Sequence, residues 1–278
     1  MTTETTNTTE AARALKARHR AMWAFGDYPA VVTDLVAPLG PVLAGACGIR
    51  LGDRVLDVAA GTGNAAIPAA EAGASVVASD LTPELFEAGQ REAARRGTRL
   101  EWRQADAEDL PFADGEFDTV MSCLGVMFAP YHQASADELI RVCRPGGTIG
   151  LLNWTPEGFI GQMFATMKPF APPPPPGALP PPMWGDETHI RSLLGDHVAD
   201  LELRRENAVI DRFADGAEFR DFFKAYYGPT VAVYKTIAAE PDRIAQLDRE
   251  LADLASQHDL GNGRMEWEYL VVTARRSA

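Results

Sequence analysis

The sequence predicts an α/β protein built on a doubly wound sheet of seven mostly parallel strands, with helices before the sheet and a Pro-rich insertion after the fifth strand. Two observations predict this class. Short apolar segments alternate with helical segments of about 10–15 residues, and parallel strands need crossovers of that kind. The strand segments are also apolar along nearly their whole length, as expected for a sheet that is covered on both faces.

The first 46 residues precede any strand signal. Residues 1–9 are polar and predict a short disordered tail. Residues 10–46 predict a helical lid, because residues 10–25 are rich in helix-forming side chains and residues 27–43 show apolar periodicity.

Residues 47–155 form the predicted core of the sheet, with five strands. Glycines follow the first strand directly, and Thr82 with Pro83 marks the start of a helix. The Arg-Pro-Gly-Gly segment at residues 144–147 ends the helix before the fifth strand. The predicted strands are Arg54–Ala59, Ser75–Asp80, Leu100–Gln104, Phe117–Ser122 and Thr148–Trp154.

Two further segments follow the fifth strand. Residues 156–198 predict a Pro-rich and helical insertion that shapes a pocket, with stiff extended polyproline over residues 169–182. Residues 199–278 predict completion of the sheet by two late strands and two helices. These strands are residues 201–213 and 265–276, and the helices are residues 217–227 and 241–258.

Composition excludes several classes of partner. The 278 residues carry 26 Lys and Arg against 39 Asp and Glu, a net charge of −13, so nucleic acid and anionic membrane surfaces are disfavoured partners. No apolar run reaches the roughly 18 residues of a membrane helix, which predicts no membrane insertion. The three cysteines lack disulfide or metal-ligand spacing and no secretion signal is evident, so we expect a cytoplasmic protein without a metal site. Only four basic residues are Lys, and Arg-rich usage is typical of high-GC bacteria.

A glycine loop joins the first strand to its helix. Gly61 and Gly63 allow a tight turn and close approach of a ligand to the backbone. Residues 61–66 also satisfy the dinucleotide fingerprint G-x-G-x-x-G/A, and Asp80 lies near the position of the ribose-binding acid. A nicotinamide-dependent oxidoreductase therefore stays open as an alternative.

Three acids follow or end neighbouring strands. Asp57 lies inside the first strand, Asp80 ends the second, and Asp106 follows the third. Because the carboxyl ends of parallel strands share one edge, these acids are expected along the ligand-binding edge of the sheet. A buried carboxylate at such a place is expensive unless a ligand, water or backbone amides need it.

Four motifs lie in order within roughly residues 45–155. They are LDVAAGTGNAAIPAA, SVVASDLTPELFEAG, QADAEDLPFADGEFDTVMSCLGVMFA and LIRVCRPGGTIGLLNW. In order and spacing they resemble the motifs of the class I S-adenosylmethionine-dependent methyltransferases. The resemblance points to the small-molecule branch typified by the ubiquinone/menaquinone C-methyltransferases and implies a Rossmann-like sheet.

The resemblance implies a role for each matched residue toward S-adenosylmethionine. The loop backbone lies against the methionyl part, the second acid accepts the ribose hydroxyls, the third accepts the adenine amine, and residues after the fourth strand border the sulfonium. The residues are Ala59, Gly61 and Gly63 in the first motif, Asp80 and Leu81 in the second, and Asp106, Ala107, Cys123 and Leu124 in the third. Asp57 is added to the predicted cofactor-binding residues because of its place at the end of the first strand. The chain departs from the family at Ala59-Ala60, where a glycine is common, and a slight shift of the loop is expected there.

From these roles we expect methyl transfer by in-line displacement to a small hydrophobic or aromatic acceptor, with S-adenosylhomocysteine as the product. His132 is the best candidate for a general base. Candidate acceptor-binding residues are Trp23, Tyr28, Phe128, Tyr131, Trp184 and Tyr226, with Phe25, His189 and Tyr227 near them in sequence. A protein that binds the cofactor without methylating is the second hypothesis. The acceptor atom and the choice between monomer and homodimer stay open.

Overall fold

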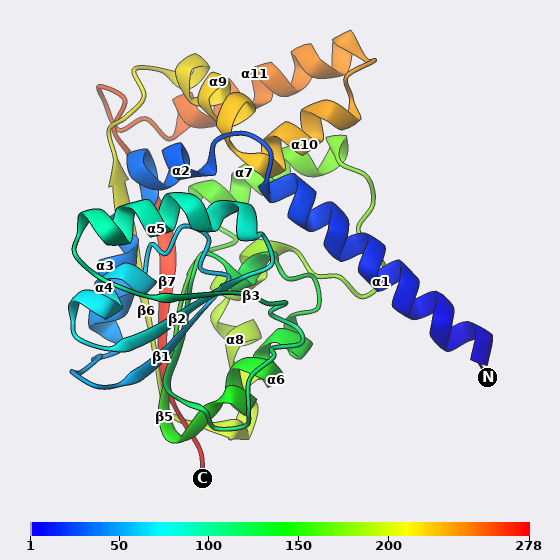
Figure 1. Cartoon of the computed structure of the whole chain (residues 1–278). Helices are drawn as coiled ribbons and strands as arrows, with labels where there is room; N and C mark the ends of the chain where they lie inside the picture. Colours follow the sequence, from blue (N-terminus) through cyan, green and yellow to red (C-terminus); the bar gives the residue numbers. More distant parts are fainter. Residues whose placement is uncertain (1) are drawn as a thin grey trace.

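The computed structural model describes residues 13–278 in full and, before them, only the helical path of α1 (Thr2–Trp23). The predicted tail at residues 1–9 lies outside the fully described residues. Figure 1 shows one sheet with helices on both faces and a group of helices above its upper edge. In the described part, no single helix is long and apolar enough to span a membrane, although the pair Tyr28–Val36 and Leu39–Ala46, bent by 70°, meets the length and composition criteria together.

The sheet has seven strands in the order β3-β2-β1-β4-β5-β7-β6. The first five strands pair in parallel, whereas β7 is antiparallel to both β5 and β6. The predicted sheet of seven mostly parallel strands is therefore confirmed. The strands are β1 (Arg54–Val58), β2 (Ser75–Asp80), β3 (Glu101–Gln104), β4 (Phe117–Cys123), β5 (Cys143–Trp154), β6 (Val198–Ile210) and β7 (Met265–Arg276).

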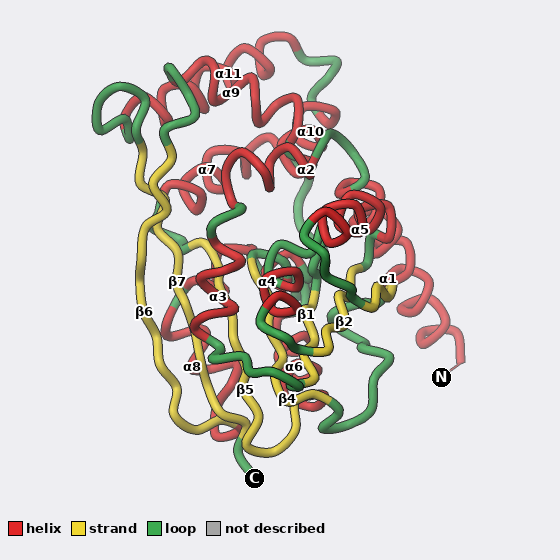
Figure 2. Tube along the Cα trace, turned by 60° about the vertical axis from the view of Figure 1, so that its left-hand side comes forward, coloured by secondary structure: helices red, strands yellow, loops and turns green. Residues whose placement is uncertain are grey.

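Helices cover the two faces in the manner of a doubly wound sheet. The strand order runs outward from β1 to β3 in one direction and from β4 to β5 in the other, so right-handed crossovers place their helices on opposite faces. Figures 1 and 2 show α3 and α4 on one side of the sheet and α6 and α8 on the other. The helices are α3 (Leu39–Ala46), α4 (Ala66–Glu71), α5 (Phe86–Arg95) after the short turn Pro83–Leu85, α6 (His132–Val142) and α8 (Glu187–Leu194).

The predicted continuous helix over residues 27–43 is wrong. The structure instead has α2 (Tyr28–Val31), a π-helical turn (Val32–Val36) and then α3, which begins after Pro38. Proline lacks the N–H that a helix interior needs, so the chain breaks there and turns. The break places Tyr28 and Val31 beside the carboxyl ends of the central strands, while α3 packs along the sheet.

Helices from both late segments gather above the carboxyl edge of the sheet. Figure 2 shows α7 (Phe159–Met167), α9 (Gly216–Tyr226), α10 (Gly228–Thr236) and α11 (Pro241–Gln257) together there, and α10 packs against α1. The helix α10 is absent from the sequence prediction, because its Gly-Pro start and its four β-branched residues give only a weak helix signal.

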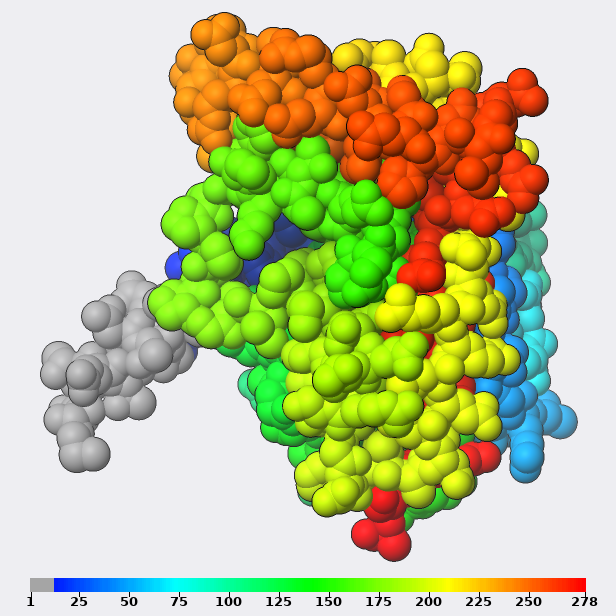
Figure 3. All heavy atoms as spheres, turned by 180° about the vertical axis from the view of Figure 1, so that it is seen from behind, coloured from blue at the N-terminus to red at the C-terminus, as the bar shows by residue number. Residues whose placement is uncertain are grey.

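The Pro-rich segment is only partly extended. Short 3₁₀ turns at Lys168–Phe170 and Pro181–Gly185 occupy its two ends, because proline is well tolerated in a first helical turn. The Leu179 amide donates to the Pro130 carbonyl at 3.0 Å, which holds the segment against the loop after β4. Figure 3 shows the surface hollowed beside this segment, with atoms of the N-terminal helices (dark blue) at the bottom of the hollow.

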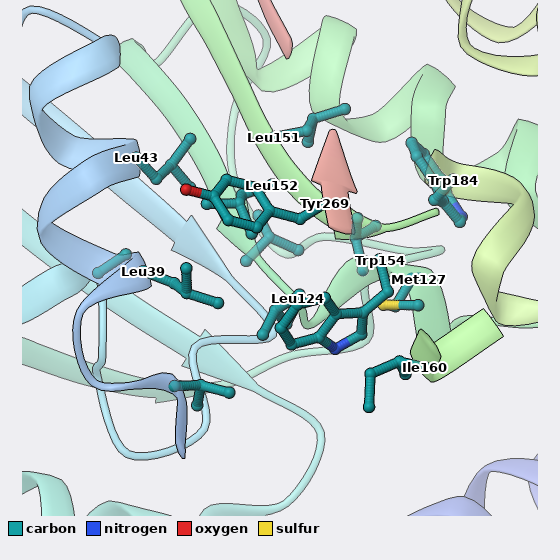
Figure 4. Packing of buried hydrophobic residues seen from close by; sticks show 14 of the residues in the cluster. Leu39, Leu43, Leu124, Met127, Leu151, Leu152, Trp154, Ile160, Trp184 and Tyr269 are labelled. Atoms are coloured by element: carbon teal, nitrogen blue, oxygen red, sulfur yellow. The ribbon is translucent and has the colours of Figure 1, made fainter. Parts of the chain in front are cut away.

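The hydrophobic core extends from the sheet into this upper layer. Figure 4 shows the Trp154 indole beside Leu124, with Ile160 below it, so residues of β5, of the loop after β4 and of α7 meet at the end of the sheet. Burial of these large side chains stabilises the attachment of the upper helices, since each buried side chain of this size contributes about 1.5–3 kcal/mol.

Candidate functional site

The glycine loop after β1 has the backbone conformation that its sequence predicts. Gly61 has φ of 55° and Gly63 has φ of 81°, both in the left-handed region that glycine adopts without strain. Ala59 also has φ of 55°. The chain therefore keeps the left-handed turn at the position where the family has glycine, and alanine accepts a strain of about 1–2 kcal/mol there.

Asp80, the last residue of β2, is locked in place by backbone donors. The Gly61 amide donates to Oδ2 at 2.8 Å and the Thr82 amide donates to Oδ1 at 2.7 Å. The side chain is 8% exposed, and burial raises its pKa to about 6, against the opposing effect of these amides. A carboxylate oxygen has more than one acceptor site, so both oxygens can still receive hydroxyl donors from a ligand.

Asp106 lies after β3 and is joined to the N-terminal helix. Lys16 of α1 donates to its Oδ1 at 2.8 Å, and the Glu108 amide donates to the same oxygen at 3.0 Å. The Lys16 ammonium also contacts the Glu108 carboxylate, whose other oxygen accepts the Tyr131 amide at 2.8 Å. The helix before the sheet is thereby held across the ends of β2 and β3.

These residues surround a cleft at the carboxyl edge of the sheet, which we call the cofactor cleft. It holds about 670 Å³ of empty space, part of it open to solvent. Its lining contains most of the predicted cofactor residues. Those present are Ala59, Gly61, Asp80, Leu81, Asp106, Ala107 and Leu124.

Three predicted cofactor residues lie behind the lining. Gly63 faces Trp102, where a Cβ would come within 2.8 Å of the ring, so glycine is needed there for packing. Cys123 is packed against the core, and burial raises the pKa of its thiol. Asp57 is 1% exposed, and its carboxylate oxygens have no hydrogen-bond partner among the described residues. Burial raises the pKa of Asp57 to about 8, and the Ala66 amide at the start of α4 offsets only part of this.

The predicted acceptor residues divide into two groups. Trp23, Tyr28 and Phe128 line the cofactor cleft and touch one another, with the Trp23 ring centroid 5.2 Å from that of Tyr28 and 4.6 Å from that of Phe128. Trp184 is fully buried away from the cleft, and Tyr226 is 39% exposed. Neither Tyr131, Trp184 nor Tyr226 is among the lining residues.

His132, the predicted general base, starts α6 and is 1% exposed. Its Nδ1 lies 2.9 Å from His189 Nε2, and its ring centroid lies 5.4 Å from that of Trp184. Burial lowers the pKa of His132 to about 4, with the nearby His189 adding to the effect. The structure places it outside the cofactor cleft, in a packed layer between α6 and α8.

A second cavity adjoins the cofactor cleft. It holds about 370 Å³ of empty space, part of it open to solvent, and shares Tyr28, Leu124 and Phe128 with the cleft. We call it the apolar chamber. Its other lining residues are Val31, Leu35, Val36, Trp154, Ile160, Phe223, Tyr227 and Trp267.

Sequence reasoning missed several lining residues. Lys16 and His19 of α1 line the cofactor cleft, and burial lowers the pKa of His19. The scarcity of lysine in this chain was a signal that could have singled out Lys16. Trp154 and Trp267 of the apolar chamber lie in strands β5 and β7, whose apolar sequences predict buried strands. Nothing in these sequences distinguishes a residue that lines a cavity from one that packs in the core.

Comparison with known proteins gives three findings. The methyltransferase domain family matches residues 55–147. An uncharacterized protein of Mycobacterium tuberculosis is 54% identical over 258 residues, which cover 93% of this chain and 94% of that protein. A demethylmenaquinone methyltransferase of Clavibacter sepedonicus is 44% identical over 104 residues, which cover 37% of this chain and 42% of that enzyme.

A solved structure extends the comparison to the fold. The YcgJ protein of Bacillus subtilis superposes with a TM-score of 0.54 and 16% sequence identity, covering 86% of this chain and 98% of that one. At this identity the likeness concerns the fold alone. It agrees with the seven-stranded mixed sheet and its flanking helices.

Proposed function

Because the chain belongs to the class I S-adenosylmethionine-dependent methyltransferases, we propose that it transfers the methyl group of that cofactor to a small hydrophobic or aromatic acceptor. The observation that carries the proposal is the Asp80 carboxylate, which two backbone amides hold at the edge of the cofactor cleft. A rigid carboxylate with free acceptor sites suits the two adjacent hydroxyls of a ribose.

The residues of the cleft fit S-adenosylmethionine in three further respects. Gly61 leaves open the space that a side chain would fill, since a Cβ there would lie 3.3 Å from the Tyr28 ring. Leu81 offers an apolar face for the adenine, and the Asp106 carboxylate keeps Oδ2 free of Lys16 for its amine. Leu124, whose backbone adopts the left-handed conformation, closes the end of the cleft nearest the apolar chamber, where the sulfonium would lie.

The bound cofactor supplies an activated methyl group, so that the acceptor's electron pair forms the new bond while the old bonding pair stays on sulfur. The protein's part is to position the acceptor and to exclude water, which can supply much of the rate. Tyr28, at the shared wall, has a pKa raised by burial, and its phenol stays a hydrogen-bond donor at neutral pH.

Calorimetric titration with S-adenosylhomocysteine tests the proposal. Asp80→Asn should weaken binding roughly tenfold or more, because a charge-assisted hydrogen bond contributes about 1.5–3 kcal/mol. Asp196→Asn, an exposed acid outside the cleft, is the matched control. Binding of a nicotinamide dinucleotide in place of S-adenosylhomocysteine would instead support the oxidoreductase alternative.

A second measurement separates methyl transfer from cofactor binding alone. The protein is incubated with S-adenosylmethionine labelled in its methyl group and with a pool of small aromatic compounds. Label should pass to an acceptor in the pool for the native chain and not for Asp80→Asn. Tight cofactor binding with no transfer across varied pools would favour the non-methylating alternative.

A further inference from the structure

The apolar chamber adjoins the cofactor cleft through a shared wall. Tyr28, Leu124 and Phe128 line both spaces. Leu124 has φ of 58°, a strained conformation for a leucine. Such strain is often found at functional sites, and here it places the side chain between the two spaces.

The walls of the chamber are uncharged. Its eleven lining residues include no Asp, Glu, Lys, Arg or His. Besides Tyr28, five of them are aromatic residues, which come from the turn after β4, from β5 and β7, and from the end of α9 and the residue that follows it. These are Phe128, Trp154, Phe223, Tyr227 and Trp267. A charged ligand would lose its hydration without gaining a partner there, which costs several kcal/mol.

Trp267, a lining residue of the chamber from β7, has a hydrogen-bond donor without a partner among the described residues. This donor is the buried indole Nε1, and Trp267 as a whole is only 1% exposed. The ring itself is held firmly, stacked on Phe159 with centroids 5.2 Å apart and an interplanar angle of 13°. A buried N–H without a partner is destabilising, so a ligand that accepts its hydrogen bond gains from a site already in place.

We propose that the apolar chamber is the acceptor site and takes an uncharged, planar molecule of one or two rings with a hydrogen-bond-accepting oxygen directed at Trp267. This inference rests on the proposed function and narrows it to one substrate class. It excludes amines, carboxylates and phosphates as acceptors. The aromatic walls favour ring stacking, and the phenols of Tyr28 and Tyr227 stay neutral because burial raises their pKa values.

Entry to the chamber is controlled by the N-terminal helix. The Trp23 ring of α1 lies edge-on to Tyr28, Phe128 and Tyr227, with centroid distances of 5.2, 4.6 and 5.9 Å. All three partners line the chamber. The acceptor therefore enters when this end of α1 moves aside, and the return of Trp23 seals both spaces from water.

Three naphthalene probes that differ in charge test the proposal on the complete chain saturated with S-adenosylhomocysteine. Calorimetry should show binding of neutral 1-naphthol, with 1-naphthoate and 1-naphthylmethylammonium at least tenfold weaker. Trp267→Phe removes only the N–H and should weaken 1-naphthol about three- to tenfold. Trp184→Phe is the matched control, because Trp184 is equally buried with an unpartnered Nε1 but lies outside the chamber.

A filling variant provides the second arm. Ile160→Trp places a large ring in the chamber and should abolish 1-naphthol binding while S-adenosylhomocysteine still binds. If Ile160→Trp does not fold, Leu35→Phe fills the chamber from another wall and serves the same test. Undiminished 1-naphthol binding in a folded filling variant, or equal binding of all three probes, would overturn the proposal. If the native chain does not bind S-adenosylhomocysteine at all, that separate result would count against the proposed function.

Discussion

The Lys16 ammonium lies 2.8 Å from Oδ1 of Asp106, and this contact ties the helix before the sheet to the end of β3. The Lys16 side chain is 16% exposed, so water screens the pair only in part. Asp106 is also the residue expected to accept the adenine amine. Under the proposed function, this one carboxylate would hold α1 through Oδ1 and the adenine amine through Oδ2.

Replacing Lys16 with Met should loosen the lid. We expect S-adenosylhomocysteine to dissociate about three- to tenfold faster, since the loss of a partly buried ion pair is worth about 1 kcal/mol. Stopped-flow displacement measures the rate. Lys16→Arg keeps the charge and should stay close to the native rate. If Lys16→Met releases the cofactor at the native rate, the ion pair does not restrain the lid.

Asp57 makes the stability of the cofactor-free protein depend on pH. Its folded-state pKa of about 8 lies above the ordinary value of 3.8, so the folded state holds the proton more tightly than the unfolded state does. Its contribution to the free energy of unfolding is present below about pH 4 and is lost as the pH rises toward 8. Asp57→Asn removes this dependence, by at most about 1.4 kcal/mol per pH unit.

Urea unfolding at a series of pH values between 4 and 9 checks this effect. The difference in unfolding free energy between native chain and Asp57→Asn cancels the contributions of other groups, including Asp80. That difference should shift in favour of the variant as the pH rises. Parallel curves would mean that Asp57 titrates normally.

Ala59 offers a test of backbone strain. With φ of 55°, alanine is strained where glycine is not, so Ala59→Gly should raise the unfolding free energy by about 0.5–1 kcal/mol. The neighbouring Ala60→Gly should lower it by about 0.5–1 kcal/mol or more, because the unfolded chain gains entropy and the buried methyl of Ala60 is lost. Denaturant unfolding of both variants gives the comparison. A loss of stability at both positions would rule out strain at Ala59.

His132 is predicted to act through packing. His132→Ala should lower the unfolding free energy by about 1–3 kcal/mol through loss of contacts with His189 and Trp184, while affinity for S-adenosylhomocysteine stays unchanged. Thermal unfolding and calorimetry provide the two readouts. Once an acceptor is known, a variant that folds normally but loses turnover would restore the general-base hypothesis.

The sheet and the cofactor cleft were largely predictable because their signals are local. The strand Ser75–Asp80 was predicted with its observed bounds, and its terminal acid lines the cleft. The helix break at Pro38 was missed, although proline gives a local reason for it. Asp57 was predicted to bind the ligand because it lies at a strand end, and the structure buries it outside the lining of the cleft.

The apolar chamber could not be predicted in the same way. Its walls come from α2, β5, α7, α9 and β7, which lie far apart in the sequence. Each lining residue has an ordinary core environment in its own segment. The packing of the upper helices decides which aromatic residues face a cavity, and this packing cannot be inferred from the hydrophobic periodicity of the sequence.

The placement of β7 between β5 and β6 sets α9 to α11, which are inserted between β6 and β7, beside a cleft that an earlier part of the chain encodes. All lining residues of the cofactor cleft lie at or before Pro130, whereas the chamber draws six of its eleven lining residues from that part and five from Trp154 onward. Under the proposed function, exchanging residues 156–264 between relatives would replace Ile160, Phe223 and Tyr227 of the chamber and leave every residue that lines the cofactor cleft in place. Such an exchange should change the acceptor preference while binding of the methyl donor is kept.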